Sequence, residues 1–275
     1  MKAALQNCVR LSVALVCCIV AACSNEPQAP PKVATSVPRG EASEDVPGEV
    51  LISAAASTKE LIEQLAAEFS KTSSATIRVN SGPSSGLATQ ILEGAPTDLY
   101  LSANREWAAQ VVDAELADSQ KELLTNKLVL IVPKGNPAEI KEPRDLLGDK
   151  VKKIALAGER VPAGMYADQA LTQLELLEKL TAHGKIARAQ DVRGALSFVE
   201  RGEAEAGIVY STDVNVVPNV EVVHEFDPAL HDEIVYVLVL LRRGVNNPAA
   251  QSFFKFLQSS DADAIYSKAG FSRLK

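Results

Sequence analysis

The sequence predicts an α/β protein whose folded part forms two lobes with a cleft between them. The first observation is that apolar runs with strand character alternate with stretches of helical periodicity from residue 49 onward, which is the rhythm of an open, largely parallel sheet. The second observation is length. Residues 49–275 are enough for one large domain or for two lobes, at about 100 to 200 residues per domain.

The first part of the folded chain contains pairs of strands and helices. We expect strands at 50–54, 76–79 and 98–102, followed by helices at 59–69, 87–92 and 106–112, respectively. A strand at 128–133, a turn rich in proline and glycine, a short helix near 144–147 and a strand at 153–157 are expected next. This alternation is typical of strands that run parallel to one another.

A second α/β unit follows. It is expected to contain helices at 163–180 and 193–201 and strands at 206–210 and 220–224, then a strand at 233–241 and closing helices at 247–257 and 262–268. We assign about 49–131 with 233–275 to the first lobe and about 132–232 to the second. A ligand is expected in the cleft, because open α/β sheets bind ligands where strands lead into helix N-termini.

The N-terminal segment has the composition of an export signal followed by a tether. The first ten residues carry two positive charges and no acid, and the apolar run at 11–22 is too short to span a bilayer as a helix. Small residues stand directly before Cys23 in a pattern that resembles a bacterial lipobox, so we expect residues 1–22 to be removed and Cys23 to carry lipid. Residues 23–48 are rich in proline, and we expect a flexible tether. The alternative is a plain secretory signal in which Cys23 is incidental.

Cysteine and histidine usage argues against a metal centre or a cofactor. Cys8, Cys17 and Cys18 lie in the segment that we expect to be removed, which leaves Cys23 as the only cysteine. A disulfide and a thiolate metal site are therefore not expected, and the three histidines show no ligand-like spacing. We expect no cofactor and no metal bound as a free cation.

The charge balance limits the partners. The formal net charge is −7, and the sequence shows no basic stripe. A nucleic acid is therefore not expected as a partner. For an anionic ligand, this charge gives no long-range attraction, so a site must work through local hydrogen bonds and dipoles.

Two turns between a strand and a helix carry serines. Ser57 follows the first strand and precedes Glu60 by three residues, which is the pattern of a capping box at the start of a helix. The first backbone N–H groups of a helix lack intrahelical partners and attract anions. Ser84 and Ser85 follow the second strand in the same way. An ordinary helix cap explains either turn alone, but two such turns in neighbouring units favour an anion site.

The second lobe offers two further helix starts. Pro162 is expected at the first helical position, which leaves the amide of Ala163 accessible. Asp191 is a plausible cap for a helix that begins at Val192, whose N–H is then free. The Asp191 carboxylate would repel a dianion unless it is turned to its own helix or to Arg193. Plain helix starts remain the alternative for both turns.

Aromatic and basic residues near these turns have different expected roles. Tyr210 ends the strand expected at 206–210, so its phenol is placed to donate a hydrogen bond into the cleft. The alternative is simple packing at the rim. Arg105 and Trp107 are expected to have structural roles.

Short segments in a fixed order give the sequence a specific resemblance. They are AAAS at 54–57, SS and LA within 84–88, GAPTDL at 94–99, VPAG at 161–164, DVRGAL at 191–196 and GIVY at 207–210. Together they resemble the ModA family, the molybdate-binding proteins of molybdate ABC importers, over roughly residues 49–275. The resemblance implies a two-lobed periplasmic-binding-protein-like fold of type II. It also implies an extracytoplasmic monomer that is not an enzyme and that delivers molybdate or tungstate to membrane permease and ATPase subunits.

The resemblance also implies a set of ligand contacts. In the family, a dehydrated tetrahedral dianion is held without a counter-charge by serine hydroxyls, backbone amides and a tyrosine hydroxyl. The matching positions are the Ser57 and Ser84 hydroxyls in the first lobe, and the Ala163 and Val192 amides with the Tyr210 hydroxyl in the second. Pro83 and Gly86 depart from the family pattern, which leaves open whether Ser84 or Ser85 makes the closer contact.

Other functions stay open at this point. A site of neutral donors should prefer fully ionised molybdate or tungstate to protonated phosphate, but it excludes sulfate only by cavity size, so a receptor for sulfate, phosphate or another oxyanion is the main alternative. A secreted enzyme acting on phosphate or sulfate esters would need a base or a metal near Ser57 or Ser84, and the sequence offers neither. A structural or adhesive lipoprotein is a third alternative.

Overall fold

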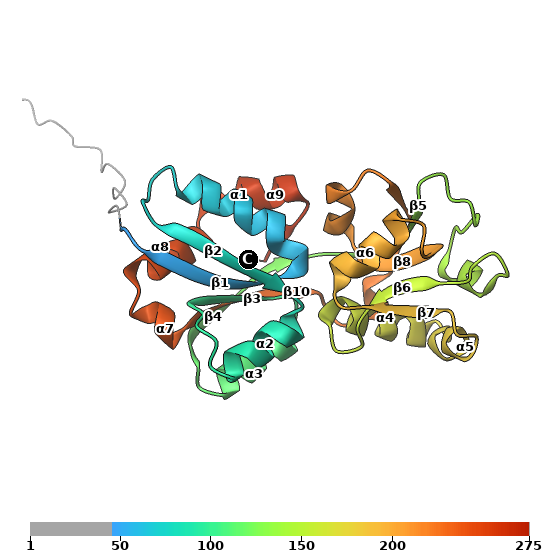
Figure 1. The fold of residues 1–275 in the computed structure, drawn as a ribbon, viewed down its shortest axis with the longest axis horizontal. Helices are drawn as coiled ribbons and strands as arrows, with labels where there is room; N and C mark the ends of the chain where they lie inside the picture. The colour runs from blue at the N-terminus through green and yellow to red at the C-terminus, as the bar shows by residue number, and fades with distance from the viewer. Residues whose placement is uncertain (1–45, 275) are drawn as a thin grey trace, which may run out of the picture. The chain divides into compact units, whose positions relative to one another are not determined.

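The computed structural model describes residues 46–274, all of which belong to one compact unit (Figure 1). The expected signal segment, Cys23 and most of the expected tether lie outside the described residues. Two sheets make up the fold, each with its own set of helices (Figure 1).

The first sheet has six strands. They are β1 (Glu49–Ala55), β2 (Thr76–Gly82), β3 (Leu99–Ser102), β4 (Ala117–Thr125), β10 (Val235–Leu241) and β11 (Ser272–Arg273), in the order β11-β4-β10-β3-β1-β2. β1 pairs in parallel with β2 and β3, whereas β10 runs antiparallel between β3 and β4. Every residue of β10 is buried, because helices cover both faces of the sheet where this strand lies.

Helices pack on the two faces of this sheet. They are α1 (Lys59–Phe69), α2 (Ser84–Leu92), α3 (Arg105–Asp113), α7 (Arg242–Val245), α8 (Pro248–Phe256) and α9 (Ser260–Ala269), with a 3-10 turn, η1 (Ala56–Thr58), before α1. Leu65 of α1 and Phe253 of α8 belong to one core cluster, and Leu87 of α2 and Trp107 of α3 belong to another. In Figure 1 α1 and α9 lie on one side of the sheet and α2 and α3 on the other.

The second sheet has five strands. They are β5 (Leu128–Pro133), β6 (Ile154–Ala157), β7 (Ile186–Ala189), β8 (Ala206–Tyr210) and β9 (Val220–Glu225), in the order β7-β6-β8-β5-β9. The helices of this part are α4 (Pro162–Gln173), α5 (Leu177–Ala182) and α6 (Val192–Glu200), with 3-10 turns η2 (Pro143–Leu147), η3 (Ser211–Val216) and η4 (Pro228–Leu230). Gly207 lets α6 approach β8 closely, since a Cβ atom there would lie 2.7 Å from Cγ2 of Val199.

The chain passes between the two sheets twice, and we refer to each sheet with its helices as a lobe. The first passage is at Asn126 and Lys127, between β4 and β5, and the return follows β9. β5 pairs with β8 and β9, so the first passage lies earlier than the boundary expected between 131 and 132. The return falls between 225 and 235, close to the expected position.

Some expected elements differ from the structure. The helix expected at 163–180 is two helices, because the chain turns at Glu175, whose φ of 59° is left-handed. The strands β4, β7 and β11 and the short helix α7 were not expected. β4 is mostly polar and partly exposed, so its sequence lacks the apolar run by which the other strands were recognised.

Candidate functional site

A small cavity lies where strands of both sheets lead into helices. Its volume is about 10 Å³, far below the range of about 300 to 1,000 Å³ that is typical of pockets for drug-sized ligands. The first lobe lines it with Ala56, Ser57, Pro83, Ser84 and Ala103, and the second lobe with Val161, Pro162, Ala163, Asp191, Val192 and Tyr210. The structure therefore brings together Ser57, Ser84, Ala163, Val192 and Tyr210, the residues that the sequence marked as ligand contacts, and leaves Ser85 outside the lining.

Ser57 reaches the cavity by a different local structure from the one expected. The predicted capping box is wrong: residues 56–58 form the 3-10 turn η1, and α1 begins only at Lys59, with no side-chain cap. Ser57 Oγ instead lies 3.0 Å from Tyr236 Oη, and Glu60 pairs with Arg193 at 2.6 Å. The Ser57 hydroxyl is thus not used by its own helix and stays available at the cavity.

Ser84 is the first residue of α2, which starts earlier than expected. Its hydroxyl oxygen accepts a hydrogen bond of 3.0 Å from the Ala103 amide, and its carbonyl accepts one of 2.8 Å from Tyr100 Oη. Because Ala103 occupies an acceptor position of Oγ, the O–H of Ser84 can donate to an occupant of the cavity. Ser84, rather than Ser85, is the serine of this pair that lines the cavity.

The two helix starts of the second lobe form as predicted. α4 begins with Pro162 and α6 begins at Val192. Asp191 Oδ1 accepts a hydrogen bond of 2.9 Å from the Gly194 amide, so this carboxylate is turned to its own helix. The amides of the first turn of each helix have no partner within the helix and lie at the positive end of its dipole. Ala163 and Val192, which line the cavity, are placed in these first turns.

Tyr210 brings a buried hydroxyl to the cavity. Its side chain is 1% exposed, and its Oη has no hydrogen-bond partner within residues 46–274. Burial raises the pKa of Tyr210 well above its usual value, so the phenol remains protonated. Its ring packs against Tyr236, with centroids 5.9 Å apart. The ring of Tyr210 therefore packs against its neighbour while its hydroxyl remains available as a donor, two roles that the sequence suggested as alternatives.

The charges next to the cavity are mostly neutralised. Arg193 lies beside Val192, but its guanidinium pairs with Glu60 at 2.6 Å and with Asp213 at 3.1 Å. Asp213 is fully buried, and this burial raises its pKa to about 7 although Arg193 acts in the opposite direction. Among the side chains that line the cavity, Asp191 is the only ionisable carboxylate. The cavity therefore offers hydroxyl and amide donors rather than a counter-charge.

Side-chain contacts join the two lobes next to residues that line the cavity. Arg193 of the second lobe reaches Glu60 and also donates to the Ser57 carbonyl at 3.3 Å. On another side, Trp107 Nε1 donates to the Arg160 carbonyl at 2.9 Å, and the Arg160 guanidinium lies 5.1 Å from the centroid of the Trp107 ring. Trp107 thus has the structural role expected from the sequence.

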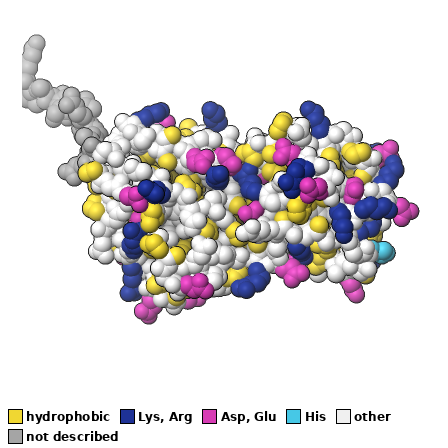
Figure 2. Space-filling model, viewed as in Figure 1, with side chains coloured by type: hydrophobic (Ala, Val, Ile, Leu, Met, Phe, Trp, Pro, Cys, Tyr) yellow, Lys and Arg dark blue, Asp and Glu magenta, His cyan; other side chains and the backbone are white. Residues whose placement is uncertain are grey.

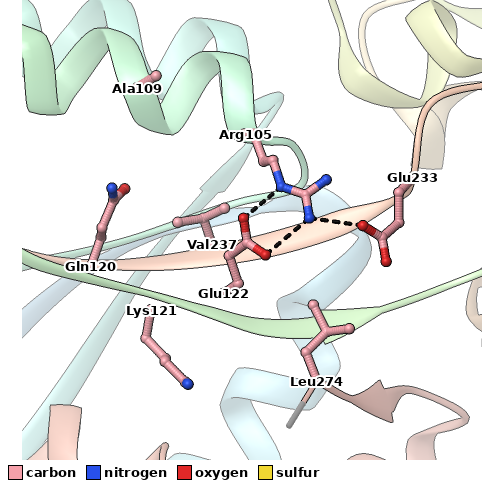
Figure 3. Close-up of a pocket in the computed structure, with 8 residues that line it drawn as sticks. All are labelled: Arg105, Ala109, Gln120, Lys121, Glu122, Glu233, Val237 and Leu274. Atoms are coloured by element: carbon pink, nitrogen blue, oxygen red, sulfur yellow. Dashed lines mark hydrogen bonds and ion pairs between the residues drawn. The ribbon is translucent and has the colours of Figure 1, made fainter.

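A larger hollow on the first lobe has a different character (Figure 3). Arg105 dominates it, but its guanidinium bridges Glu122 and Glu233 at 2.5 Å and 2.8 Å. In Figure 3 the Lys121 side chain extends away from this group. Because two carboxylates neutralise Arg105, this hollow does not present that cation to an anionic ligand.

The surface carries both signs of charge. On the face drawn in Figure 2, Lys and Arg side chains are interspersed with Asp and Glu side chains.

Across the described part of the chain, no group of three or more His, Cys, Asp or Glu side chains is placed to hold a metal ion. In the same residues no helix is both long enough and apolar enough to cross a membrane.

Sequence reasoning missed three residues around the cavity. Tyr236 lies within an otherwise aliphatic strand, Asn126 lies in a passage between lobes, and Arg193 was considered only as a partner for Asp191. The one signal for Tyr236 was its hydroxyl, since a polar atom in a buried strand needs a partner.

Two α/β lobes around a small cavity of hydrogen-bond donors define a solute-binding protein. The family model described as "Bacterial extracellular solute-binding protein" matches residues 50–272, and the chain belongs to this family.

Relatives support the same class and fold. The chain is 36% identical to the molybdate-binding protein ModA of Haemophilus influenzae, over 81% of this chain and 89% of that one. It is 37% identical to YvgL of Bacillus subtilis, provisionally named as an ABC transporter substrate-binding lipoprotein, over 80% of this chain and 85% of that one. The solved periplasmic molybdate-binding protein of Azotobacter vinelandii matches with a TM-score of 0.74 at 25% identity, over 82% of this chain and all of that one. The two-lobed periplasmic-binding-protein-like fold predicted from the sequence is confirmed.

Proposed function

We propose that this protein binds molybdate, and tungstate at the same site, and delivers the ion to an ABC importer. The observation that carries the proposal is the cavity between the lobes, which is lined by hydrogen-bond donors and includes a buried tyrosine hydroxyl without a protein partner. The relationship to molybdate-binding proteins agrees with this site.

The proposed contacts come from both lobes. Ser57 and Ser84 supply hydroxyls from the first lobe, and the second lobe supplies the Ala163 and Val192 amides and the Tyr210 hydroxyl. Each lobe holds only part of the donor set, so the ion is fully coordinated when the lobes close on it. We therefore expect hinge closure about the passages that join the lobes.

The donor set favours a fully ionised oxyanion over a protonated one. A proton on the ligand would meet donors rather than acceptors at Ser57, Ser84 and Tyr210. Asp191 is an acceptor in the lining, but one of its oxygens is already bound to the Gly194 amide. Sulfate carries no proton at neutral pH, so its exclusion depends on the size of the closed cavity.

The surroundings of the serines support binding rather than ester hydrolysis. The Ser57 hydroxyl has a phenol as its neighbour, and the Ser84 hydroxyl has a backbone amide. Neither group is a base that could take the proton of a serine nucleophile. Of the classes considered from the sequence, a transport receptor therefore fits the site and an esterase does not.

We also propose how the protein is attached. Residues 1–22 act as a signal peptide, Cys23 carries the lipid, and residues 23–48 form the tether to a binding domain at 49–275. The protein works as a monomer that docks on a membrane permease, whose ATPase subunit works in the cytoplasm. Mass spectrometry of protein extracted from membranes should find an acylated cysteine at the mature N-terminus, and an unmodified N-terminus would refute the anchor.

Ligand binding is tested on protein that begins at Ser24. Calorimetry and thermal unfolding are measured with molybdate, tungstate, sulfate, phosphate and chromate at one ionic strength. A ligand at 100 times its Kd stabilises the folded state by about 2.7 kcal/mol, which is a rise in Tm of about 5 to 10 °C for a domain of this size. We expect this rise with molybdate and tungstate only, and a weaker effect after Ser57→Ala. A response led by sulfate or phosphate would overturn the proposed cargo, and no response to any ion would overturn the binding function.

A further inference from the structure

Tyr236 connects the cavity to the passage between the lobes. It lies in β10, is fully buried, and is not part of the cavity lining. Its hydroxyl has two polar neighbours in the part of the chain that the structure describes: Ser57 Oγ at 3.0 Å and Asn126 Nδ2 at 3.3 Å. Its role is therefore decided by the direction of these two hydrogen bonds.

The Asn126 side chain has a fixed orientation. Its Oδ1 accepts hydrogen bonds from the Lys127 amide at 2.9 Å and from Ser211 Oγ at 3.0 Å. A backbone amide only donates, so this oxygen must face Lys127 and the Nδ2 group must face the other way. Nδ2 then donates its two hydrogens to Thr212 Oγ1, at 2.8 Å, and to Tyr236 Oη.

The direction at Asn126 sets the direction at Tyr236. A carboxamide NH₂ group does not accept hydrogen bonds, so the Tyr236 O–H finds its acceptor at Ser57 Oγ. Burial raises the pKa of Tyr236, which keeps its hydrogen in place. Ser57 Oγ therefore accepts from Tyr236, and the hydrogen of Ser57 is left to point into the cavity that this residue lines.

We propose that Asn126 and Tyr236 form a one-way hydrogen-bond chain that makes Ser57 a dedicated donor to the bound oxyanion. This inference rests on the proposed function. Asn126 and Tyr236 are positioning residues, because they act on the ligand only through Ser57. Ser84 needs no such chain, since its oxygen accepts directly from the Ala103 amide, a donor that cannot reverse.

The chain also joins both lobes at the passage between them. Ser211 and Thr212, which hold the Asn126 amide, belong to the turn η3 of the second lobe, whereas Tyr236 belongs to the first. The hydrogen bonds that end at Ser57 thus involve residues of both lobes.

A double-mutant cycle on molybdate affinity tests the chain. Calorimetry gives the Kd of molybdate for the wild type, Tyr236→Phe, Ser57→Ala and the double variant. Tyr236→Phe should weaken binding about tenfold, which corresponds to about 1.4 kcal/mol. In the Ser57→Ala background the same change should cost less than about twofold. Tyr266→Phe is the matched control, because Tyr266 is as deeply buried and its hydroxyl donates to the Leu257 carbonyl, outside the cavity lining.

Each outcome has a distinct meaning. A wild type that binds no molybdate would overturn the proposed function and this inference with it. A wild type that binds, with Tyr236→Phe unchanged or with an equal loss in both backgrounds, would overturn the chain alone. Should Tyr236→Phe not fold, Asn126→Ala serves in the same cycle. It should weaken binding severalfold in the wild type but not in the Ser57→Ala background, and an equal loss in both would count against the chain.

Discussion

Replacing Tyr210 with phenylalanine should weaken ligand binding without destabilising the empty protein. The Tyr210 hydroxyl is buried and has no partner in the described structure. An unsatisfied buried hydroxyl costs about 1 to 3 kcal/mol, and opening of the lobes to water would remove that cost. The Tm of the unliganded Tyr210→Phe variant should therefore stay unchanged, or rise by about 2 to 4 °C for each kcal/mol relieved.

Molybdate affinity should move in the opposite direction. A hydrogen bond to a charged group is worth about 1.5 to 3 kcal/mol, so losing one should raise the Kd about 10- to 150-fold. Calorimetry and thermal unfolding on the same samples measure both effects. Tyr266→Phe loses a satisfied hydroxyl, which donates to the Leu257 carbonyl at 2.7 Å, so its Tm should fall while its Kd stays within twofold. A Tyr210→Phe protein that loses stability as Tyr266→Phe does, with its Kd intact, would refute the reasoning.

Two further predictions concern the charges beside the cavity. Glu60→Gln removes a partly exposed ion pair between the lobes, which is worth about 1 kcal/mol or less. We therefore expect molybdate affinity to fall a fewfold and the Tm of the empty protein to stay unchanged. Arg193→Ala should lower this Tm in addition, because Asp213 loses its cation, and equal Tm values for the two variants would contradict this. The pKa of Asp213 is raised from 3.8 to about 7, so between these pH values the folded state holds a proton that the unfolded state has released. The stability contributed by this group is therefore lost as pH rises from about 4 to about 7, and the wild type should lose up to about 1.4 kcal/mol per pH unit relative to Asp213→Asn. A difference in stability that does not change with pH would count against the raised pKa of Asp213.

Most elements of the fold could be predicted from local patterns. The bounds expected for α1 agree with the structure, and β1, β5 and β8 lie where apolar runs placed them. The strand β4 was not predicted because its sequence is largely polar, and it forms by pairing along β10. The strand β7 was not predicted because it contains Arg188, which forms an ion pair with Asp168 of α4 at 2.8 Å. In both cases the strand depends on partners that are distant in the sequence.

In the candidate site too, some residues are predicted by local patterns and others depend on partners that are distant in the sequence. Free amides at helix starts are local features, so the sequence could place Ala163 and Val192 at turns that the structure brings to one cavity. The contact between Ser57 and Tyr236 joins residues 179 positions apart, and no local pattern encodes it. The capping box predicted at Ser57 failed for this reason, because a distant phenol occupies the neighbourhood of its hydroxyl and Arg193 binds Glu60.

The placement of Arg193 explains how a cavity of this kind can be selective. A free guanidinium about 4 Å from an anion would attract it by about 4 kcal/mol per unit charge at an effective dielectric constant of 20, and it would do so for sulfate, phosphate and molybdate alike. Here Glu60 and Asp213 engage the guanidinium, so its charge serves lobe closure instead. Discrimination then depends on the size of the closed cavity and on whether the ligand oxygens match donors of fixed direction. The hydroxyls of Ser57 and Ser84, each held by a protein donor, supply that fixed direction.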